Sequence, residues 1–321
     1  MNREFWENKN VLVTGAGGFK GSHLVEVLSK TNANIVALLR DFDPQSYFEY
    51  RNLGKKCSVA IGDLKDTRKI MDILTKYEID VIFHLGAQPL VTIALQNPIE
   101  TLESNIMGTV NLLEAARVYR KIECMVMVSS DKAYGPSKNV PYKENERLHG
   151  KAPYDVSKSC ADLISQMYAG VYNIPVTIGR CANVFGPGDL NMNRIIPGVI
   201  ESAIKDRDLE IRSDGKMIRE YIYVKDCIEG YILLAENIHK TKGQAFNLAS
   251  DNIMNVLEVV KRVSQAINVP VKTKILNKAK AEIPEQHLDA SKIKSLLGWS
   301  TKVSFEDAIQ ESYDWYLEVL K

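Results

Sequence analysis

The chain has 321 residues, of which 45% are hydrophobic and 25% charged, a composition typical of globular proteins and not of disordered ones. Lysine plus arginine (41) nearly balance aspartate plus glutamate (40), and a net charge of +1 would attract neither nucleic acid nor an anionic membrane. The five cysteines and five histidines lack metal-ligand spacing, so no metal site is expected. No apolar run reaches the roughly 18 residues of a membrane span, and we expect a cytoplasmic protein.

Short apolar runs alternate with longer helical patterns over residues 1–180. The runs lie at 11–15, 35–39, 59–62, 81–86, 125–130 and 176–180, and the helical patterns at about 20–30, 65–77, 100–120 and 154–172. Alternating strands and helices form a parallel sheet that is covered by helices on both faces. The sequence therefore predicts a doubly wound α/β domain, whose ligands lie beyond the carboxyl ends of the strands.

Beyond Gly186 the alternation becomes less regular. Helices are expected near 194–205, 225–237, 253–266 and 304–319, and short extended segments near 209–212 and 219–224. No linker rich in proline, glycine or serine separates this part from the first. We expect residues 181–321 to form a smaller α/β lobe packed on residues 1–180, with some of its segments returning to the first domain.

The first predicted strand ends in TGAGGFKG, where Gly15, Gly18 and Gly21 form a GxxGxxG pattern before a helix. Glycines let backbone N–H groups and the helix N-terminus approach a pyrophosphate closely. Because this loop follows the first strand of a βα alternation, it predicts a dinucleotide site, to which Phe19 and Lys20 would also contribute.

About twenty residues further along, an acidic residue would bind the ribose hydroxyls of NAD, whereas an arginine would bind the extra phosphate of NADP. The chain has Arg40 followed by Asp41, so the sequence leaves NAD and NADP both open. Asp63, which follows the third strand, either lines the adenine site or caps a helix. The other candidates for the cofactor site are Leu64, Leu85, Ala87, Gln88 and Asn105.

Tyr154 and Lys158 form a YxxxK pair on a helix that Pro153 opens. The i, i+4 spacing brings both side chains to one helix face, where the ammonium would lower the pKa of the tyrosine toward the working pH. Tyr154 is therefore a candidate general base for a hydroxyl group. The alternative is a solvated lysine beside a packed tyrosine, but the glycine loop and the SSDK sequence at 129–132 favour catalysis.

Segments spread over nearly the whole chain resemble the extended short-chain dehydrogenase/reductases of the NAD-dependent epimerase/dehydratase family. They are TGAGGFKG, FHLGAQPLV, NPIETLESNIMGTVNLLEA, VSSDKAYG, PYDVSK, NVFGPGD, REYIYVKD and LLGW. The resemblance implies a Rossmann-type domain with a bound nicotinamide dinucleotide, and a nucleotide-activated hexose in the cleft of the second lobe. It also implies a homodimer, formed here through the helices at 100–120 and 154–172.

The family contains 4-epimerases and 4,6-dehydratases, and both reactions begin alike. Tyr154 takes the proton of the hydroxyl on carbon 4 while hydride leaves for the nicotinamide, and Ser130 hydrogen-bonds the same oxygen. A dehydratase also needs a base at carbon 5 and an acid at the departing hydroxyl of carbon 6.

Asp131 and Lys132 directly follow Ser130, and an Asp-Lys pair at this place is similar to CDP-glucose 4,6-dehydratases. The resemblance implies that Asp131 protonates the leaving hydroxyl and that Lys132 acts at carbon 5. The alternatives are a surface ion pair in a 4-epimerase and a non-catalytic nucleotide sensor on the same fold. Differences from those dehydratases leave the nucleotide open among CDP, GDP, dTDP and UDP; Arg40 resembles GDP-mannose dehydratases, which use NADP.

The diphosphate of such a substrate needs cations and polar donors in a chain with almost no net charge. By their positions in the family motifs, the candidate substrate-binding residues are Asn183, Asn193, Arg194, Arg212, Arg219, Tyr223 and Gln286. For each arginine the alternative is a solvated surface side chain.

Overall fold

A computed structural model of the chain describes residues 1–137, 139–278 and 283–320. Its main sheet has seven parallel strands in the order β10-β6-β5-β4-β1-β2-β3. The strands are β1 (Asn10–Thr14), β2 (Asn34–Leu39), β3 (Ser58–Ile61), β4 (Val81–His84), β5 (Cys124–Ser130), β6 (Val176–Cys181) and β10 (Ala245–Leu248). The chain adds strands first on one side of β1 and then on the other, so the strand order reverses between β1 and β4. A crevice for ligands opens at such a reversal, beyond the carboxyl ends of the strands.

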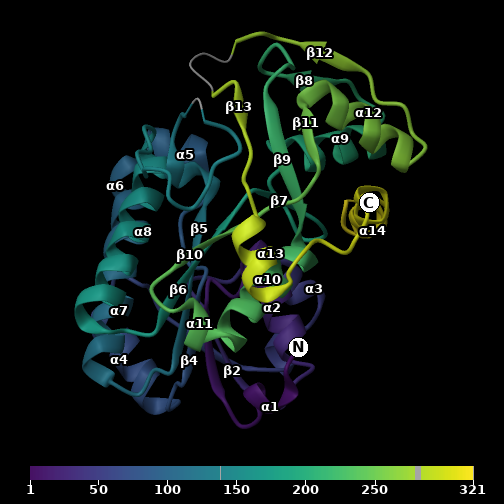
Figure 1. Cartoon of the computed structure of the whole chain (residues 1–321). Helices are drawn as coiled ribbons and strands as arrows, with labels where there is room; N and C mark the ends of the chain where they lie inside the picture. The colour runs from purple at the N-terminus through teal and green to yellow at the C-terminus, as the bar shows by residue number, and fades with distance from the viewer. Residues whose placement is uncertain (138, 279–282, 321) are drawn as a thin grey trace.

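Helices cover both faces of this sheet (Figure 1). The longer ones are α4 (Thr67–Lys76), α7 (Gly108–Tyr119) and α8 (Pro153–Tyr172) on one face, and α2 (Phe19–Leu28) and α10 (Val224–Glu236) on the other. Because successive side chains of a strand point to opposite faces, Leu12 joins the core under α4, α7 and α8, whereas Val11 and Val13 join the core under α2 and α10. The doubly wound α/β fold predicted from the sequence is therefore confirmed.

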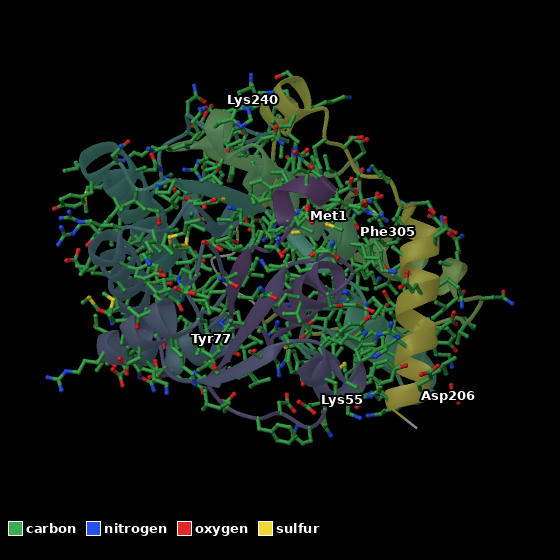
Figure 2. All side chains as sticks on the ribbon, turned by 90° about the horizontal axis from the view of Figure 1, so that it is seen from below. Met1, Lys55, Tyr77, Asp206, Lys240 and Phe305 are labelled. Atoms are coloured by element: carbon green, nitrogen blue, oxygen red, sulfur yellow. The ribbon has the colours of Figure 1, made fainter. Side chains whose placement is uncertain are left out.

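The second lobe stands over one end of the main sheet and contains two small sheets (Figure 1). β9 (Ile218–Tyr223) pairs with β7 (Asn183–Phe185), β11 (Ile253–Asn255) and β13 (Glu285–Gln286), and β8 (Leu209–Ile211) pairs with β12 (Thr273–Ile275). Its helices are α9 (Ile195–Ile204), α12 (Val256–Ala266) and α14 (Phe305–Val319). In Figure 2, α14 runs along one edge of the molecule from Phe305.

The remaining helices are short. They are α1 (Arg3–Trp6), α3 (Tyr47–Tyr50), α5 (Val91–Gln96), α6 (Pro98–Leu102), α11 (Ile238–Thr241) and α13 (Ser291–Leu297), with 3₁₀ turns at Leu53–Lys55 and Asp131–Tyr134 and a π-helical turn at Glu103–Met107. Across the described ranges, no helix has the length and apolar character that crossing a lipid bilayer requires.

Most predicted elements of the first 180 residues match the structure, but several elements of the second half were not predicted, among them β7, β12, β13, α11 and α13. The expected helix at 253–266 begins only at Val256, because Ile253–Asn255 forms β11 beside β9. The seventh strand, β10, was also not predicted; it lies beside β6 in the main sheet.

Candidate active site

A cavity of about 630 Å³ opens beyond the carboxyl ends of the strands, between the main sheet and the second lobe. Its walls come from the loop after β1, the ends of β2, β4 and β5, the first turn of α8, and the segment from β7 into α9. The candidate residues that line it are Gly15, Gly18, Phe19, Lys20, Gly21, Arg40, Asp41, Asp63, Leu64, Leu85, Ala87, Ser130, Asp131, Lys132, Tyr154, Lys158, Asn183, Asn193, Arg194 and Arg212.

The glycine loop at one end of this cavity leaves no room for side chains. Gly15 has a φ of +67°, and a Cβ there would lie 2.8 Å from backbone atoms of Gly86. A Cβ on Gly21 would lie 2.0 Å from the carbonyl oxygen of Gly15. Helix α2 begins at Phe19 without a side-chain cap, so its first N–H groups can meet an anion in the cavity. This backbone cradle fits the pyrophosphate of a dinucleotide.

Next to the loop, charged side chains surround the end of β2. The Arg40 guanidinium donates to Asp41 Oδ2 at 3.1 and 3.2 Å and lies 3.7 Å from Glu100 Oε1. Asp63 accepts from the backbone N–H of Lys65 at 2.8 Å, whereas the cap of α4 is Asp66. Asp63 is therefore not the helix cap that the sequence allowed, and its side chain belongs to the cavity wall.

Gln88 and Asn105 do not line the cavity, although both were candidates for the cofactor site. The amide group of Asn105 accepts from the backbone N–H of Gln88 at 2.7 Å and donates to its carbonyl at 3.1 Å. The same Asn105 Nδ2 donates to Ser157 Oγ at 2.9 Å, and Ser157 donates to the carbonyl of Tyr154 at 2.7 Å. These two buried residues thus tie the loop after β4 to the start of α8 and do not reach into the cavity.

At the end of β5, Ser130 caps a 3₁₀ turn and presents the Asp-Lys pair to the cavity. Ser130 Oγ donates to Asp131 Oδ1 at 2.9 Å, and Lys132 Nζ donates to Asp131 Oδ2 at 3.1 Å. Asp131 is only 3% exposed, so the pair is not a surface ion pair. Gln286, from β13, donates to the carbonyl of Asp131 at 3.0 Å and accepts from Lys132 Nζ. Gln286 therefore orients the Asp-Lys pair through these hydrogen bonds, although it does not itself line the cavity.

Tyr154 and Lys158 lie on one face of the first turns of α8, as predicted, but their electrostatics differ from the expectation. Burial raises the pKa of Tyr154 to about 12, against the lowering effect of the Lys20 charge. Burial also lowers the pKa of Lys158 to about 8, and its ammonium donates to the carbonyl of Val128 at 3.0 Å. The expectation that Lys158 brings the pKa of Tyr154 toward neutrality is wrong for this structure, because burial of the phenol outweighs the cations nearby.

Of the candidates for the substrate site, four line the cavity. Arg194 pairs with Asp189 at 2.9 Å, and Asn183 donates to the carbonyl of Glu220 at 3.0 Å. Asn193 and Arg212 complete this wall of the lobe.

Arg219 and Tyr223, both on β9, lie outside the cavity lining. Arg219 donates to the carbonyl of Ile218 at 2.8 Å and is paired in register with Gln286. Tyr223, the last residue of β9, is 2% exposed and donates to Glu311 Oε2 at 2.6 Å, so it packs toward α14. Tyr221, two residues earlier, lines the cavity instead.

Cys181 is a lining residue that was not among the candidates. It ends β6, and the rule that ligands gather at strand ends was the signal that could have found it. Within residues 1–137, 139–278 and 283–320, no three His, Cys, Asp or Glu side chains gather as metal ligands.

Comparisons with known proteins agree with this geometry. The family model described as GDP-mannose 4,6 dehydratase matches residues 12–312. The CDP-glucose 4,6-dehydratase of Salmonella typhimurium is 34% identical over 258 residues, which are 77% of this chain and 71% of that protein.

Solved structures are similar to this chain as well, and each of the following two covers 97% of it. The UDP-glucose 4-epimerase of Thermotoga maritima, with UDP-glucose, is 26% identical with a TM-score of 0.89 over its whole chain. The dTDP-glucose 4,6-dehydratase of Bacillus anthracis, in complex with NAD, is 25% identical with a TM-score of 0.85 over 97% of its chain.

Proposed function

Because the chain belongs to the GDP-mannose 4,6-dehydratase family of NAD-dependent epimerases and dehydratases, we propose that it is a nucleotide-sugar 4,6-dehydratase. It would convert an NDP-hexose to the NDP-4-keto-6-deoxyhexose through a transient 4-ketone. The observation that carries this proposal is the Asp131–Lys132 pair, enclosed beside Ser130 in the wall of the cavity. Dehydration needs two ionisable groups beyond those of an epimerase, and this pair supplies them.

The cofactor of the proposed reaction is NAD. The loop from Gly15 to Gly21 and the open N-terminus of α2 fit its pyrophosphate, and a related dehydratase of known structure is bound to NAD. Arg40, which an NADP phosphate would need, already pairs with Asp41 and lies near Glu100. When bound there, NAD would supply a reversible hydride acceptor for the oxidation at carbon 4. The adenosine would lie against Asp41 and Asp63.

The side chains of this protein would divide the proton transfers among them. The phenolate form of Tyr154 removes the proton of the carbon 4 hydroxyl, with Ser130 as the second partner of that oxygen, and the Lys20 charge stabilises this phenolate. The Lys132 ammonium first passes a proton to Asp131 across their 3.1 Å contact, and the neutral amine then takes the proton of carbon 5, which the new ketone has made acidic. Asp131 protonates the departing hydroxyl of carbon 6, and the 3.1 Å contact between Lys132 and Asp131 provides a path for the proton.

The substrate diphosphate would bind to the lobe formed by residues 181–321, opposite the dinucleotide on residues 1–180. Asn183, Asn193, Arg194 and Arg212 supply amide and guanidinium donors along that wall of the cavity. Arginine suits this role because its planar fork can bind two phosphate oxygens at once. Two segments of the second half, β10 and α10, pack in the first domain.

A 4-epimerase is the second candidate function, and the similarity to the UDP-glucose 4-epimerase, at a TM-score of 0.89, favours it. An epimerase needs only Ser130, Tyr154 and Lys158, which this cavity also holds.

The two reactions differ in the mass of the product. The full chain would be incubated with NAD and a panel of CDP-, GDP-, dTDP- and UDP-hexoses, and each product weighed by mass spectrometry. Loss of one water from one member of the panel supports the dehydratase. A new sugar of unchanged mass would instead establish the epimerase, and turnover with NADP but not NAD would overturn the cofactor assignment.

The proposed assembly is a homodimer through α7 and α8. Leu163, Met167 and Val171 follow one another at i, i+4 and i+8 on α8 with exposures of 52%, 41% and 68%, and Val118 on α7 is 54% exposed. An apolar stripe of this kind on two adjacent helices is typical of a surface that another protein covers.

A further inference from the structure

Lys20, in the glycine loop, has an ammonium group with unusual partners. Its Nζ lies 3.4 Å from Cys181 Sγ and 3.5 Å from the hydroxyl of Tyr231, and 5.7 Å from the centre of the Tyr231 ring. Among the ion pairs of the described residues, none joins Lys20 to a carboxylate. An ammonium enclosed in a cavity wall is costly without an opposite charge nearby. The group in direct contact that can become an anion most readily is the Cys181 thiol.

Two donors converge on the Cys181 sulfur. Besides Lys20, the hydroxyl of Tyr231 on α10 donates to Sγ at 3.1 Å, whereas the carbonyl of Ser129, the acceptor that Cys181 would have as a thiol, lies 4.0 Å away. Cys181 is only 2% exposed, but it ends β6 directly beside Ser130 in the sheet register and lines the same cavity as the catalytic candidates. A small electrophile reaches Cys181 through this cavity, whereas buried Cys124 does not line it. Donors that point at one sulfur favour the thiolate over the thiol.

The pKa of Cys181 is lowered, which favours its thiolate, whereas the pKa values of three other cysteines are raised. The hydrogen bond from Cys227 and the Lys20 charge lower the pKa of Cys181, against the effects of burial and of Asp131. In contrast, burial raises the pKa of Cys57, Cys124 and Cys227. The charged or titratable groups around Cys181 are Lys20 on α2, Cys227 and Tyr231 on α10, Asp131 after β5, Tyr154 and Lys158 on α8, and Glu220 on β9.

We propose that Cys181 is a thiolate paired with the Lys20 ammonium in the wall of the cavity, and that it is a site of covalent modification by soft electrophiles. With an alkyl halide, the sulfur lone pair forms the new S–C bond and the halide leaves with its bonding electrons. No proton is released, because the sulfur is already deprotonated. This reactivity does not depend on which sugar-nucleotide reaction the enzyme catalyses.

The test is the rate at which iodoacetamide alkylates each cysteine of the full chain, followed by peptide mass spectrometry over a range of pH. At about pH 6.5 an ordinary thiol is only about 1% ionised. We expect the Cys181 peptide to react at least roughly tenfold faster at this pH than the peptide of Cys160, a partly exposed cysteine on α8. Its rate should also change little up to about pH 8. Labelling of Cys181 that is no faster than that of Cys160, or that appears only above about pH 8, would overturn the proposal.

Two variants test the partners of the sulfur. Lys20→Met should slow the alkylation of Cys181 at about pH 6.5 by roughly tenfold and leave Cys160 unchanged. Buried Cys124 serves as the monitor of folding, because it would become reactive if the variant unfolded. Tyr231→Phe keeps the ring and removes the 3.1 Å donor, and should slow the reaction by a smaller factor. If both folded variants react like the original chain, the lysine–thiolate pair does not exist.

Discussion

Lys132 is the residue whose replacement separates the two candidate reactions. In Lys132→Met the first hydride transfer stays possible, whereas removal of the carbon 5 proton should slow by roughly 100-fold or more, because its base is lost. The expected trace is a reduced-nicotinamide absorbance that appears on adding substrate and then persists. Lys143→Met is the matched control, because the side chain of Lys143 is 64% exposed and outside the cavity lining.

A dehydratase should also incorporate solvent deuterium at carbon 5 of its product, since the proton removed there exchanges with water before it is replaced. Full activity of Lys132→Met, with a product of unchanged mass and no deuterium at carbon 5, would contradict the dehydratase and leave the epimerase.

Tyr154 should control the first hydride transfer, which precedes removal of the carbon 5 proton. Tyr154→Phe removes the base for the carbon 4 hydroxyl, so the reduced-nicotinamide signal should fall by roughly 100-fold or more in a single turnover. Tyr172→Phe, on the exposed end of the same helix, should leave the signal unchanged. If Tyr154→Phe reduces the nicotinamide at the original rate, Tyr154 is not the base.

For the individual residues of the site, the sequence predicted which side chains lie together but not their pKa values. The glycine loop and the YxxxK pair are local patterns, so their spacing alone predicts that they lie at one site. The pKa of Tyr154 depends on burial and on Lys20, which is 134 residues away in the chain. The contacts of Cys181 with Lys20 and Tyr231 likewise exist only once β6, α2 and α10 pack together, and no local pattern marks them.

Among the elements, the loop between β1 and α2 should be the most sensitive to an added methyl group. Gly21→Ala would bring a Cβ to 2.0 Å from the carbonyl of Gly15, so the loop must shift and NAD affinity should fall by roughly tenfold or more. In Gly170→Ala, on the exposed end of α8, the new Cβ meets nothing within 4 Å. That control should keep NAD affinity, because Gly170 lies outside the cavity lining. Calorimetric titration with NAD measures both variants, and equal affinities would contradict a pyrophosphate at this loop.

Buried His84, at the end of β4, should make the free energy of unfolding depend on pH in the acid range. Thr109 donates its hydroxyl to the carbonyl of Asn105, so it accepts from His84 Nε2 at 3.1 Å, and Thr14 donates to Nδ1 at 2.8 Å. Both ring nitrogens are therefore satisfied in the neutral form. Burial, with a smaller effect of the Lys158 charge, lowers the pKa of His84 to about 3.

Because the folded chain holds His84 neutral while the unfolded chain protonates it near pH 6.5, this stability is present above that pH and is lost as the pH falls toward 3. Between about pH 6.5 and pH 4 the loss should be roughly 3 kcal/mol. Urea unfolding at several pH values measures it. His84→Gln should reduce this dependence and leave the part that comes from His23, whose pKa burial lowers to about 4, whereas His239→Gln, at an exposed position, should leave it unchanged. An unchanged slope in His84→Gln would contradict the assignment.

The strands missed in the second half show why elements are harder to predict there. β10 is only four residues long, and its neighbours in the sheet, β6 and then β5, come from far earlier in the chain. β11 has only three residues before the capping box of α12, where Asn255 and Glu258 cap each other. Short strands next to strong helix signals carry too little periodicity of their own, so only tertiary pairing identifies them.

On the scale of the whole molecule, the two halves of the chain close around one cavity. The first half supplies the glycine loop and the side chains proposed for catalysis, and the second supplies Asn183, Arg194 and Arg212. The second half also returns to the main sheet through β10 and α10, which ties the lobe to the sheet. Helices α7 and α8 lie on the side of the molecule away from α14, so a partner could cover them without meeting the lobe (Figure 1).

This arrangement leads to the prediction about assembly. If two copies pair through α7 and α8 about a two-fold axis, the apolar stripe of one copy packs against the same stripe of the other, and a charge placed there is buried without a partner. Leu163→Glu combined with Met167→Glu should therefore weaken the dimer by roughly 100-fold or more and give monomers at micromolar concentration in light scattering. Ile275→Glu, at a 50% exposed position on β12, is the matched control and should stay dimeric. A wild-type chain that is monomeric at the same concentration would contradict the dimer, and a double variant that stays dimeric would move the interface to another surface.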